Sequence, residues 1–287
     1  MNLWDESTEK RFFVEALGHF ATPEKLFYSL KSGKFAYVPK ECDAEGQTLQ
    51  SRNTLIGSFT ETWAKNILAP IARKFDLYAV NTVECPEGGL TKRSEADLAF
   101  CTSASKIQKA QNIKLIFEIK MSIISNYQYT ESGSIEFFGD YKTHKGNPSL
   151  LRSDSMLKAI GKSIGIRVSG VESAKIPIVV LGNSPITNNY SHKVDFLKTA
   201  GVIQGFWSLN PAPTKSDFIQ ETKKLGFQTI QDIHNIEKLV KDLLCTKLNY
   251  FSSMISQERL GENIRIAYQQ STDEAKAEKF LSLIREV

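Results

Sequence analysis

The chain has 287 residues, of which 24% are charged and 41% are hydrophobic. This composition is typical of a globular protein and excludes collagen-like and intrinsically disordered chains. The sequence lacks the run of about eighteen apolar residues that a membrane-spanning helix needs, and acidic residues interrupt residues 1–20, so we expect no membrane segment and no signal peptide. The four cysteines are far apart and form no C-x-x-C pair, which predicts reduced thiols in a cytoplasmic protein.

The net charge of +4 is unevenly distributed along the chain. Residues 51–212 carry 19 basic and 13 acidic side chains, whereas residues 1–50 carry 6 basic and 8 acidic ones and residues 213–287 carry 11 of each. A basic surplus confined to one segment indicates a polyanionic partner. A solvated basic face is the alternative interpretation of the same charges.

The first half of the chain predicts helices followed by three strands. Residues 1–50 have the pattern of short helices and irregular structure. A helix is predicted over residues 53–74, where apolar residues recur at steps of three and four. Segments 77–83, 94–102 and 113–124 are rich in apolar and β-forming residues and predict strands. The last of these has so few polar positions that we expect it in the centre of a sheet.

The second half continues with a helix between two strands. A helix is predicted over residues 151–167, and the apolar run at 176–181 predicts a buried parallel strand. The order strand, helix, strand predicts a right-handed crossover. A further helix over residues 191–199 and a strand over 202–209 follow. Prolines soon after this strand mark a boundary, beyond which the pattern is mostly helical.

These elements predict an α/β protein with a central mixed β-sheet flanked by helices. We expect this core at residues 51–212, between an N-terminal helical and irregular region at residues 1–50 and a helical C-terminal region at residues 213–287. No internal repeat or low-complexity tract interrupts this organisation.

Several widespread catalytic motifs are absent. Residues 161–163 (Gly-Lys-Ser) resemble the end of a phosphate-binding P-loop, but Met156 stands where the first glycine of that loop is needed. The segment also lies inside a predicted helix instead of following a strand. The sequence contains no G-x-S-x-G and no G-x-G-x-x-G, so it supports neither a hydrolase nucleophile elbow nor a dinucleotide site.

Three charged residues on neighbouring predicted strands form the candidate catalytic group. Asp97 lies in the strand at 94–102, and Glu118 and Lys120 lie in the strand at 113–124. Because side chains alternate along a strand, Glu118 and Lys120 project from one face. A carboxylate and an amine in so apolar a strand require a partner, a metal ion or a water-filled cleft.

The chemistry of these residues fits hydrolysis of a phosphodiester. Two convergent carboxylates suffice to bind Mg²⁺, which prefers oxygen ligands and retains several waters, and the main-chain carbonyl of Ile119 is available as a third oxygen. A Mg²⁺ ion on Asp97 and Glu118 would polarise a phosphoryl oxygen and lower the pKa of a bound water. Lys120 would orient that water and offset charge developing on the phosphate.

Other interpretations of these residues remain open. An internal salt bridge of Lys120 with Glu118 or Asp97 would serve structure alone. The spacing of an acidic residue two positions before a lysine also occurs elsewhere, and its main competitor is Asp140 with Lys142 in a turn-like stretch. The remaining occurrences lie in predicted helices, where residues two apart do not face each other.

The arrangement resembles the PD-(D/E)-x-K nuclease superfamily, which includes most type II restriction endonucleases. The resemblance rests on Asp97 and Glu118-Ile119-Lys120, with a helix before them and a crossover helix and strand after them, and it covers residues 53–182. Ala96 stands where the family often has proline. The resemblance implies a restriction-endonuclease-like core, Mg²⁺ as cofactor, cleavage of double-stranded DNA at a specific sequence and a homodimer matched to a symmetric site. A repair or recombination nuclease of the same fold and a DNA-binding module without catalysis are the alternatives.

The family often adds a glutamate from the helix before the sheet, and Glu61 is the candidate here. On a helical wheel, Glu61 falls away from the main apolar stripe and shares a face with Gly57 and Ala64. A solvent-exposed side chain is the alternative for Glu61. Glu95 lies two residues before Asp97, so we expect it to face the same way, as a neighbour of the metal ligands or as one of them.

A basic run follows the predicted catalytic strand and contains one acidic residue, Asp154. Next to a nuclease site these side chains are expected to contact DNA phosphates. Lys158 and Lys162 are four residues apart and hence share a helical face, although a solvated helix face is the alternative for each of them. The predicted DNA-binding residues are Lys142, His144, Lys145, Arg152, Lys158 and Lys162.

Overall fold

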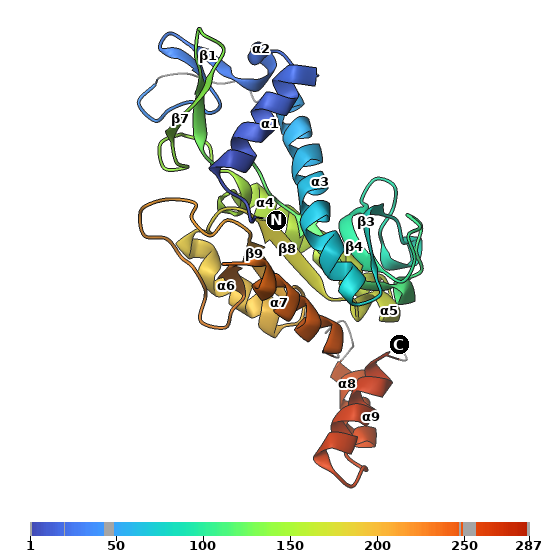
Figure 1. The fold of residues 1–287 in the computed structure, drawn as a ribbon. Helices are drawn as coiled ribbons and strands as arrows, with labels where there is room; N and C mark the ends of the chain where they lie inside the picture. The colour runs from blue at the N-terminus through green and yellow to red at the C-terminus, as the bar shows by residue number, and fades with distance from the viewer. Residues whose placement is uncertain (1, 20, 43–48, 247, 249–256, 286–287) are drawn as a thin grey trace.

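The strands of this protein form two sheets. A computed structural model describes residues 2–19, 21–42, 49–246, 248 and 257–285. Within these residues there are a mixed sheet of six strands and an antiparallel sheet of four. Figure 1 shows the smaller sheet above the larger one, with the long helix α3 (Gln50–Lys74) running from one to the other. The expected α/β fold with a central mixed sheet is therefore confirmed.

The larger sheet consists of β3 (Tyr78–Val83), β4 (Ala96–Cys101), β5 (Ile113–Ile119), β8 (Ile178–Gly182), β9 (Gly205–Ser208) and β10 (Phe227–Thr229). Their order across the sheet is β10-β9-β8-β5-β4-β3. β3, β4 and β5 pair antiparallel, whereas β5, β8, β9 and β10 pair parallel. β5 is an interior strand, as predicted, and its residues Leu115, Ile116 and Phe117 are completely buried.

Helices cover both faces of the larger sheet. Besides α3 they are α4 (Ser153–Ser169), α6 (Asn188–Thr199) and α7 (Ile233–Cys245), with short helices η1 (Pro86–Gly88), η2 (Ala110–Asn112), η3 (Ser149–Leu151) and α5 (Val171–Ala174) in the connections. Because side chains alternate along β5, Leu115 and Phe117 pack in the core with α3 and α7. Ile116 lies on the other face and packs with Ile166 of α4.

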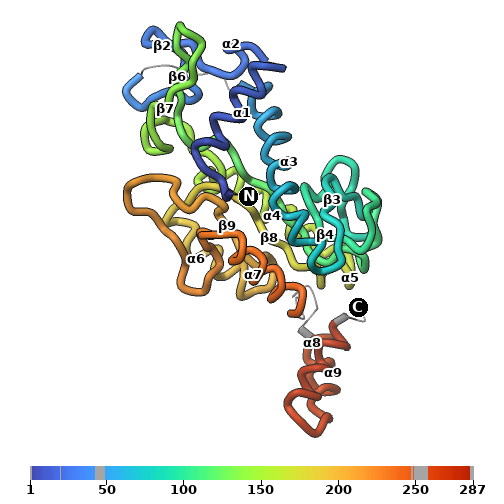
Figure 2. Tube along the Cα trace, viewed as in Figure 1, coloured from blue at the N-terminus to red at the C-terminus, as the bar shows by residue number. Residues whose placement is uncertain are grey.

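The smaller sheet belongs to an N-terminal lobe, which comprises α1 (Glu6–His19), α2 (Pro23–Leu26), β1 (Tyr28–Leu30), β2 (Gly33–Phe35), β6 (Asn126–Tyr129) and β7 (Ile135–Gly139). The strands β1 and β2 correct the prediction of helices and irregular structure for residues 1–50. Each has only three residues, too few for an alternating pattern to be recognised. β2 pairs with β6, so this region is joined to the predicted core. Figure 2 shows the same lobe built from two distant parts of the chain.

The region after residue 212 contains the expected helices and also one strand. β10 pairs in parallel with β9, so the larger sheet continues beyond the predicted boundary. Helices α8 (Gln257–Ala267) and α9 (Asp273–Arg285) pack against each other. Across the described ranges, no helix is both long and apolar enough to cross a membrane.

Candidate active site

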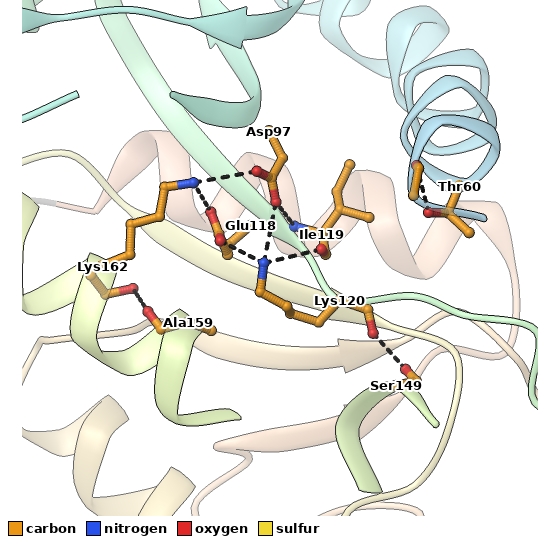
Figure 3. Close-up of polar contacts among 10 residues, drawn as sticks. Thr60, Asp97, Glu118, Ile119, Lys120, Ser149, Ala159 and Lys162 are labelled. Carbon is orange, nitrogen blue, oxygen red and sulfur yellow. Dashed lines mark hydrogen bonds and ion pairs between the residues drawn. The ribbon is translucent and has the colours of Figure 1, made fainter. Parts of the chain in front are cut away.

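Asp97 and Glu118 lie side by side on the antiparallel neighbours β4 and β5. Leu98 pairs with Phe117 in the register of these strands, which places Asp97 and Glu118 across from each other. The main-chain N–H of Ile119 donates a hydrogen bond of 2.7 Å to Oδ2 of Asp97 and holds that carboxylate in place. The two predicted carboxylates are therefore brought together, as Figure 3 shows.

Lys120 follows β5 directly, and its ammonium group lies among three oxygen atoms. Its Nζ is 2.6 Å from Oε1 of Glu118, 3.3 Å from the carbonyl oxygen of Ile119 and 3.5 Å from Oδ2 of Asp97. Lys120 and Glu118 thus meet on one face of the strand, as the alternation of side chains predicts. The ion pairs that a purely structural role would require are present as well, so the contacts alone do not separate catalysis from structure.

A second lysine, Lys162 of α4, reaches the same carboxylates. Its Nζ is 2.6 Å from Oε2 of Glu118 and 3.3 Å from Oδ1 of Asp97, and only 16% of its side chain is exposed. Lys158, one turn earlier, has 71% of its side chain exposed and pairs with Asp154. The two lysines therefore point differently: Lys162 points into the candidate site, beside the cavity, and Lys158 points to solvent. The expected contacts of both with DNA phosphates stay predictions.

Asp97, Glu118, Lys120 and Lys162 form one cluster, in which oppositely charged neighbours counteract the effect of burial on the pKa values. Burial and the neighbouring Asp97 raise the pKa of Glu118, while Lys120 and Lys162 act in the opposite direction. Burial alone would lower the pKa of Lys120, but the carboxylates of Glu118 and Asp97 outweigh it and raise that pKa. Oε2 of Glu118 is buried without a hydrogen bond, so Lys162 holds it by ion pairing only.

Glu61 and Glu95 line an open cavity beside Asp97. The cavity has a volume of about 290 Å³, and Lys162 also lines it. Burial raises the pKa of Glu61, and the negative charge of Asp97 raises it further. Glu61 therefore faces the candidate site, and the alternative of a fully solvated helix side chain does not describe its surroundings.

His144 corrects the prediction for the DNA-binding residues. It is only 2% exposed, its Nε2 lies 2.9 Å from the carbonyl oxygen of Ile124, and its ring stacks on Tyr37 with 4.0 Å between ring centroids. Burial lowers the pKa of His144, which favours the neutral ring. A buried neutral imidazole cannot serve as a phosphate contact. The other predicted residues outside the site are exposed, namely Lys142, Lys145, Arg152 and Lys158.

The competing pair Asp140 and Lys142 forms no comparable site. Asp140 accepts hydrogen bonds from the hydroxyl of Thr214 and from the main-chain N–H of Lys142. The Lys142 ammonium donates instead to the carbonyl oxygen of Asp217 at 3.3 Å. The two side chains are thus engaged with different partners, unlike Glu118 and Lys120.

Two residues that support the site have no recognisable signal in the sequence. The Ser149 hydroxyl donates to the carbonyl oxygen of Lys120 at 2.7 Å and accepts from the N–H of Asn183 at 3.1 Å, so it ties the ends of β5 and β8 together. Thr82 lines the cavity with Asp97 and has a φ of 53°, a left-handed conformation that β-branched residues rarely adopt. Serine and threonine are common in loops and strands, so only the folded structure identifies these roles.

The oxygen atoms around Lys120 come from two carboxylates and one main-chain carbonyl. Across the part of the chain that the structure describes, no group of three or more His, Cys, Asp or Glu side chains is arranged to hold a metal ion. A Mg²⁺ ion does not require such a group, because it is commonly bound through one or two carboxylates and several waters. The donor set is therefore compatible with Mg²⁺ and less suited to zinc, which prefers nitrogen and sulfur ligands.

Comparison of this chain with protein-family models, with curated proteins and with solved structures found no match. The fold and the geometry of the cluster thus carry the functional argument. The strongest part of that geometry is the convergence of Asp97, Glu118 and Lys120 beside an open cavity.

Proposed function

We propose that this protein is a Mg²⁺-dependent endodeoxyribonuclease of the PD-(D/E)-x-K type, acting as a type II restriction endonuclease on double-stranded DNA. One observation carries the proposal. Oxygen atoms of Asp97, Glu118 and Ile119 converge within 3.5 Å of a single cationic group, the ammonium of Lys120. A mixed sheet with helices on both faces, as in the proposed restriction-endonuclease-like core, supports the same assignment.

Asp97 and Glu118 are the proposed metal ligands, with the Ile119 carbonyl as a third oxygen. The buried Oε2 of Glu118, which lacks a hydrogen bond, fits this role because it retains acceptor capacity. A bound Mg²⁺ ion supplies charge stabilisation at the phosphoryl oxygen and lowers the pKa of a bound water. Glu61, at the wall of the adjoining cavity, is a further proposed ligand or positioning group.

Lys120 is proposed to position the attacking water and to stabilise the phosphate in the transition state. Its ammonium stays protonated, because the two carboxylates raise its pKa, so it acts as a hydrogen-bond donor and a positive charge. The exposed Lys142, Lys145, Arg152 and Lys158 are the proposed contacts to the DNA backbone. Their phosphate contacts would position the duplex without reading its sequence.

Cleavage of a supercoiled plasmid tests the proposal. We expect cleavage with Mg²⁺, none with EDTA, and loss of cleavage in Asp97→Asn and Glu118→Gln while both variants remain folded. Asp140→Asn is the matched control and should cut like the unmodified chain, because Asp140 bonds with Thr214 outside the cluster. Wild-type cutting by either active-site variant would contradict the assignment, and DNA binding without cleavage under any divalent metal would favour a non-catalytic DNA-binding module.

The pattern of fragments separates the two nuclease classes. A restriction endonuclease should give discrete fragments from a DNA of known sequence. A repair or recombination nuclease of the same fold should instead select branched or damaged structures and give no discrete pattern on intact duplex.

A homodimer is part of the proposal, because two-fold symmetry matches a symmetric DNA site. The outer face of α4 supports it. Leu157, Ile164 and Val168 recur at helical spacing there and are 62%, 43% and 48% exposed, and exposed apolar surface of this kind marks interfaces. Light scattering after size-exclusion chromatography should therefore report a dimer, and Leu157→Lys with Ile164→Lys should shift it to the monomer.

A further inference from the structure

Two lysines divide the four carboxylate oxygens of the cluster between them. Lys120 contacts Oε1 of Glu118 and Oδ2 of Asp97, whereas Lys162 contacts Oε2 of Glu118 and Oδ1 of Asp97. Figure 3 shows Lys120 approaching the carboxylates from the end of β5 and Lys162 approaching them from α4. The two ammonium groups therefore balance the charge of the two carboxylates.

The two lysines differ in how their main chains are placed. Lys120 directly follows β5, and its main chain is fixed by the Leu181 carbonyl and the Ser149 hydroxyl, both at 2.7 Å. Its ammonium donates a hydrogen bond to Glu118 and forms an ion pair with Asp97. Lys162 reaches the carboxylates from the middle of α4, donates a hydrogen bond of 3.3 Å to Oδ1 of Asp97 and forms an ion pair with Glu118.

Lys162 also has open space beside it. It lines the cavity of about 290 Å³ that is shared with Lys92, Arg93 and Glu61, whereas Lys120 does not line that cavity. The Lys162 ammonium therefore has the cavity beside it as space into which it can move.

Electrostatics requires such a movement when a divalent cation binds. The cluster of Asp97, Glu118, Lys120 and Lys162 is formally neutral, so a divalent cation would leave it with a surplus of two positive charges. Like charges that share the same oxygens repel strongly at these distances. Lys162 borders the cavity and Lys120 does not, so Lys162 is the group with space to move away.

We propose that Lys162 is a displaceable internal cation, which occupies the carboxylates of the metal-free protein and moves onto a DNA phosphodiester in the cavity when a divalent metal ion binds. This inference rests on the proposed nuclease function and gives Lys162 a role in ordering its steps. Lys162 is a positioning residue, because it controls access to Asp97 and Glu118. The basic side chains of Lys92 and Arg93 on the same cavity would hold the phosphate that receives it.

The test compares Lys162→Met with Lys158→Met in the full-length protein. Lys158 is the matched control, since it is the same residue on the same helix but pairs only with Asp154 at the surface. Binding of Mg²⁺ and Ca²⁺ without DNA is measured by calorimetry. We expect Lys162→Met to bind the ions about tenfold more tightly, because one competing unit charge is gone, and Lys158→Met to bind them like the unmodified chain.

A second measurement tests whether the Lys162 ammonium contacts a DNA phosphate once a divalent ion has bound. With Ca²⁺ present, Lys162→Met should lower the slope of DNA affinity against salt by about one, the loss of a single phosphate contact. Without a divalent ion the slope should not change, because Lys162 is then held by the carboxylates. If Lys162→Met does not fold, Lys162→Gln is used for both measurements.

The outcomes separate this inference from the proposed function. Unchanged or weaker ion binding by the folded Lys162 variant, beside normal Mg²⁺-dependent cleavage by the unmodified chain, would overturn the inference and leave the nuclease standing. Tighter ion binding without DNA cleavage by the unmodified chain would support the displacement and overturn the nuclease. If the unmodified chain binds no divalent ion, both are wrong.

Discussion

Two buried glutamates, one in the N-terminal lobe and one in the larger sheet, are held in opposite ways. Glu9 is 1% exposed and Glu118 is 4% exposed, and burial raises the pKa of both. The Glu9 carboxylate accepts four hydrogen bonds of 2.8 to 3.1 Å from uncharged donors, namely the Trp4 indole, the Tyr127 hydroxyl and the main-chain N–H groups of Ile124 and Ser125. Glu118 has one hydrogen bond, from Lys120, and a second ammonium beside an oxygen that lacks one.

The difference separates a carboxylate saturated with hydrogen bonds from the carboxylate proposed as a metal ligand. Both oxygens of Glu9 are occupied by donors, so its carboxyl group joins α1 to the segment that follows β5. Glu118 instead has two ammonium neighbours and spare acceptor capacity at its buried Oε2. Burial and a raised pKa are common to both glutamates, so the nature of their partners is what sets them apart.

The largest expected effect is on catalysis at Lys120. Lys120→Met should fold, still bind Mg²⁺ and DNA, and lose cleavage by about two to three orders of magnitude, because a positioned donor and charge are removed. Lys120→Arg keeps the charge without the compact ammonium and should rescue stability better than activity. Single-turnover cleavage and thermal unfolding are measured for both variants. Loss of folding with Met and recovery of both properties with Arg would make Lys120 structural.

The next largest effect is on the free energy of unfolding, and it contrasts Glu9 with Glu118. Glu9→Leu leaves four buried donors without an acceptor and should lower the free energy of unfolding by about 3 kcal/mol or more. Glu118→Gln should lower it by less than Glu9→Leu does, since Lys120 and Lys162 both keep the Asp97 carboxylate as an ion-pair partner. Urea unfolding measures both. Equal losses of unfolding free energy in the two variants would contradict the proposed difference between Glu9 and Glu118.

A smaller effect is expected in the pH dependence of stability. Burial raises the pKa of Glu9 above its ordinary value of 4.5, so folding favours the protonated acid. The stability that this proton contributes is present below about pH 4.5 and is lost as pH rises through the folded pKa. Glu9→Gln does not titrate, so the unfolding free energy of the unmodified chain should fall relative to this variant as the pH rises above 4.5. A difference that stays constant as the pH rises would show that Glu9 keeps its ordinary pKa.

The smallest expected effect is on the reactivity of two cysteine thiols, one of which is buried. Burial raises the pKa of the Cys101 thiol to about 12, whereas Cys245 is exposed. Only the thiolate reacts readily, so a thiol reagent at pH 8 should modify Cys245 quickly and Cys101 only after denaturation. Mass spectrometry of modified peptides identifies the site. Rapid labelling of Cys101 in the native protein would indicate local opening of β4.

The sequence predicted the central sheet and the group on β4 and β5 because period-two alternation fixes which side chains share a strand face. It did not identify Lys162 as part of that group. Lys158 and Lys162 differ by only about 40° around the helix and about 6 Å along it, and the position of the sheet decides which of them turns inward. His144 was wrongly predicted to contact DNA. Its ring is buried by stacking on Tyr37, and a contact between such distant parts of the chain cannot be recognised in the sequence.

The pairing of β2 with β6 has a consequence for the order of folding. Phe35 lies opposite Gln128 in the lobe, and the N–H of Trp4 donates to the carbonyl oxygen of Leu209 at 3.0 Å. These contacts join residues far apart in sequence, whereas β4 and β5 are close neighbours along the chain. Since closing long loops slows folding, we expect the strands around Asp97 and Glu118 to assemble first. Trp4 leaves the ribosome long before Leu209, yet it can dock there only after β9 has been synthesised.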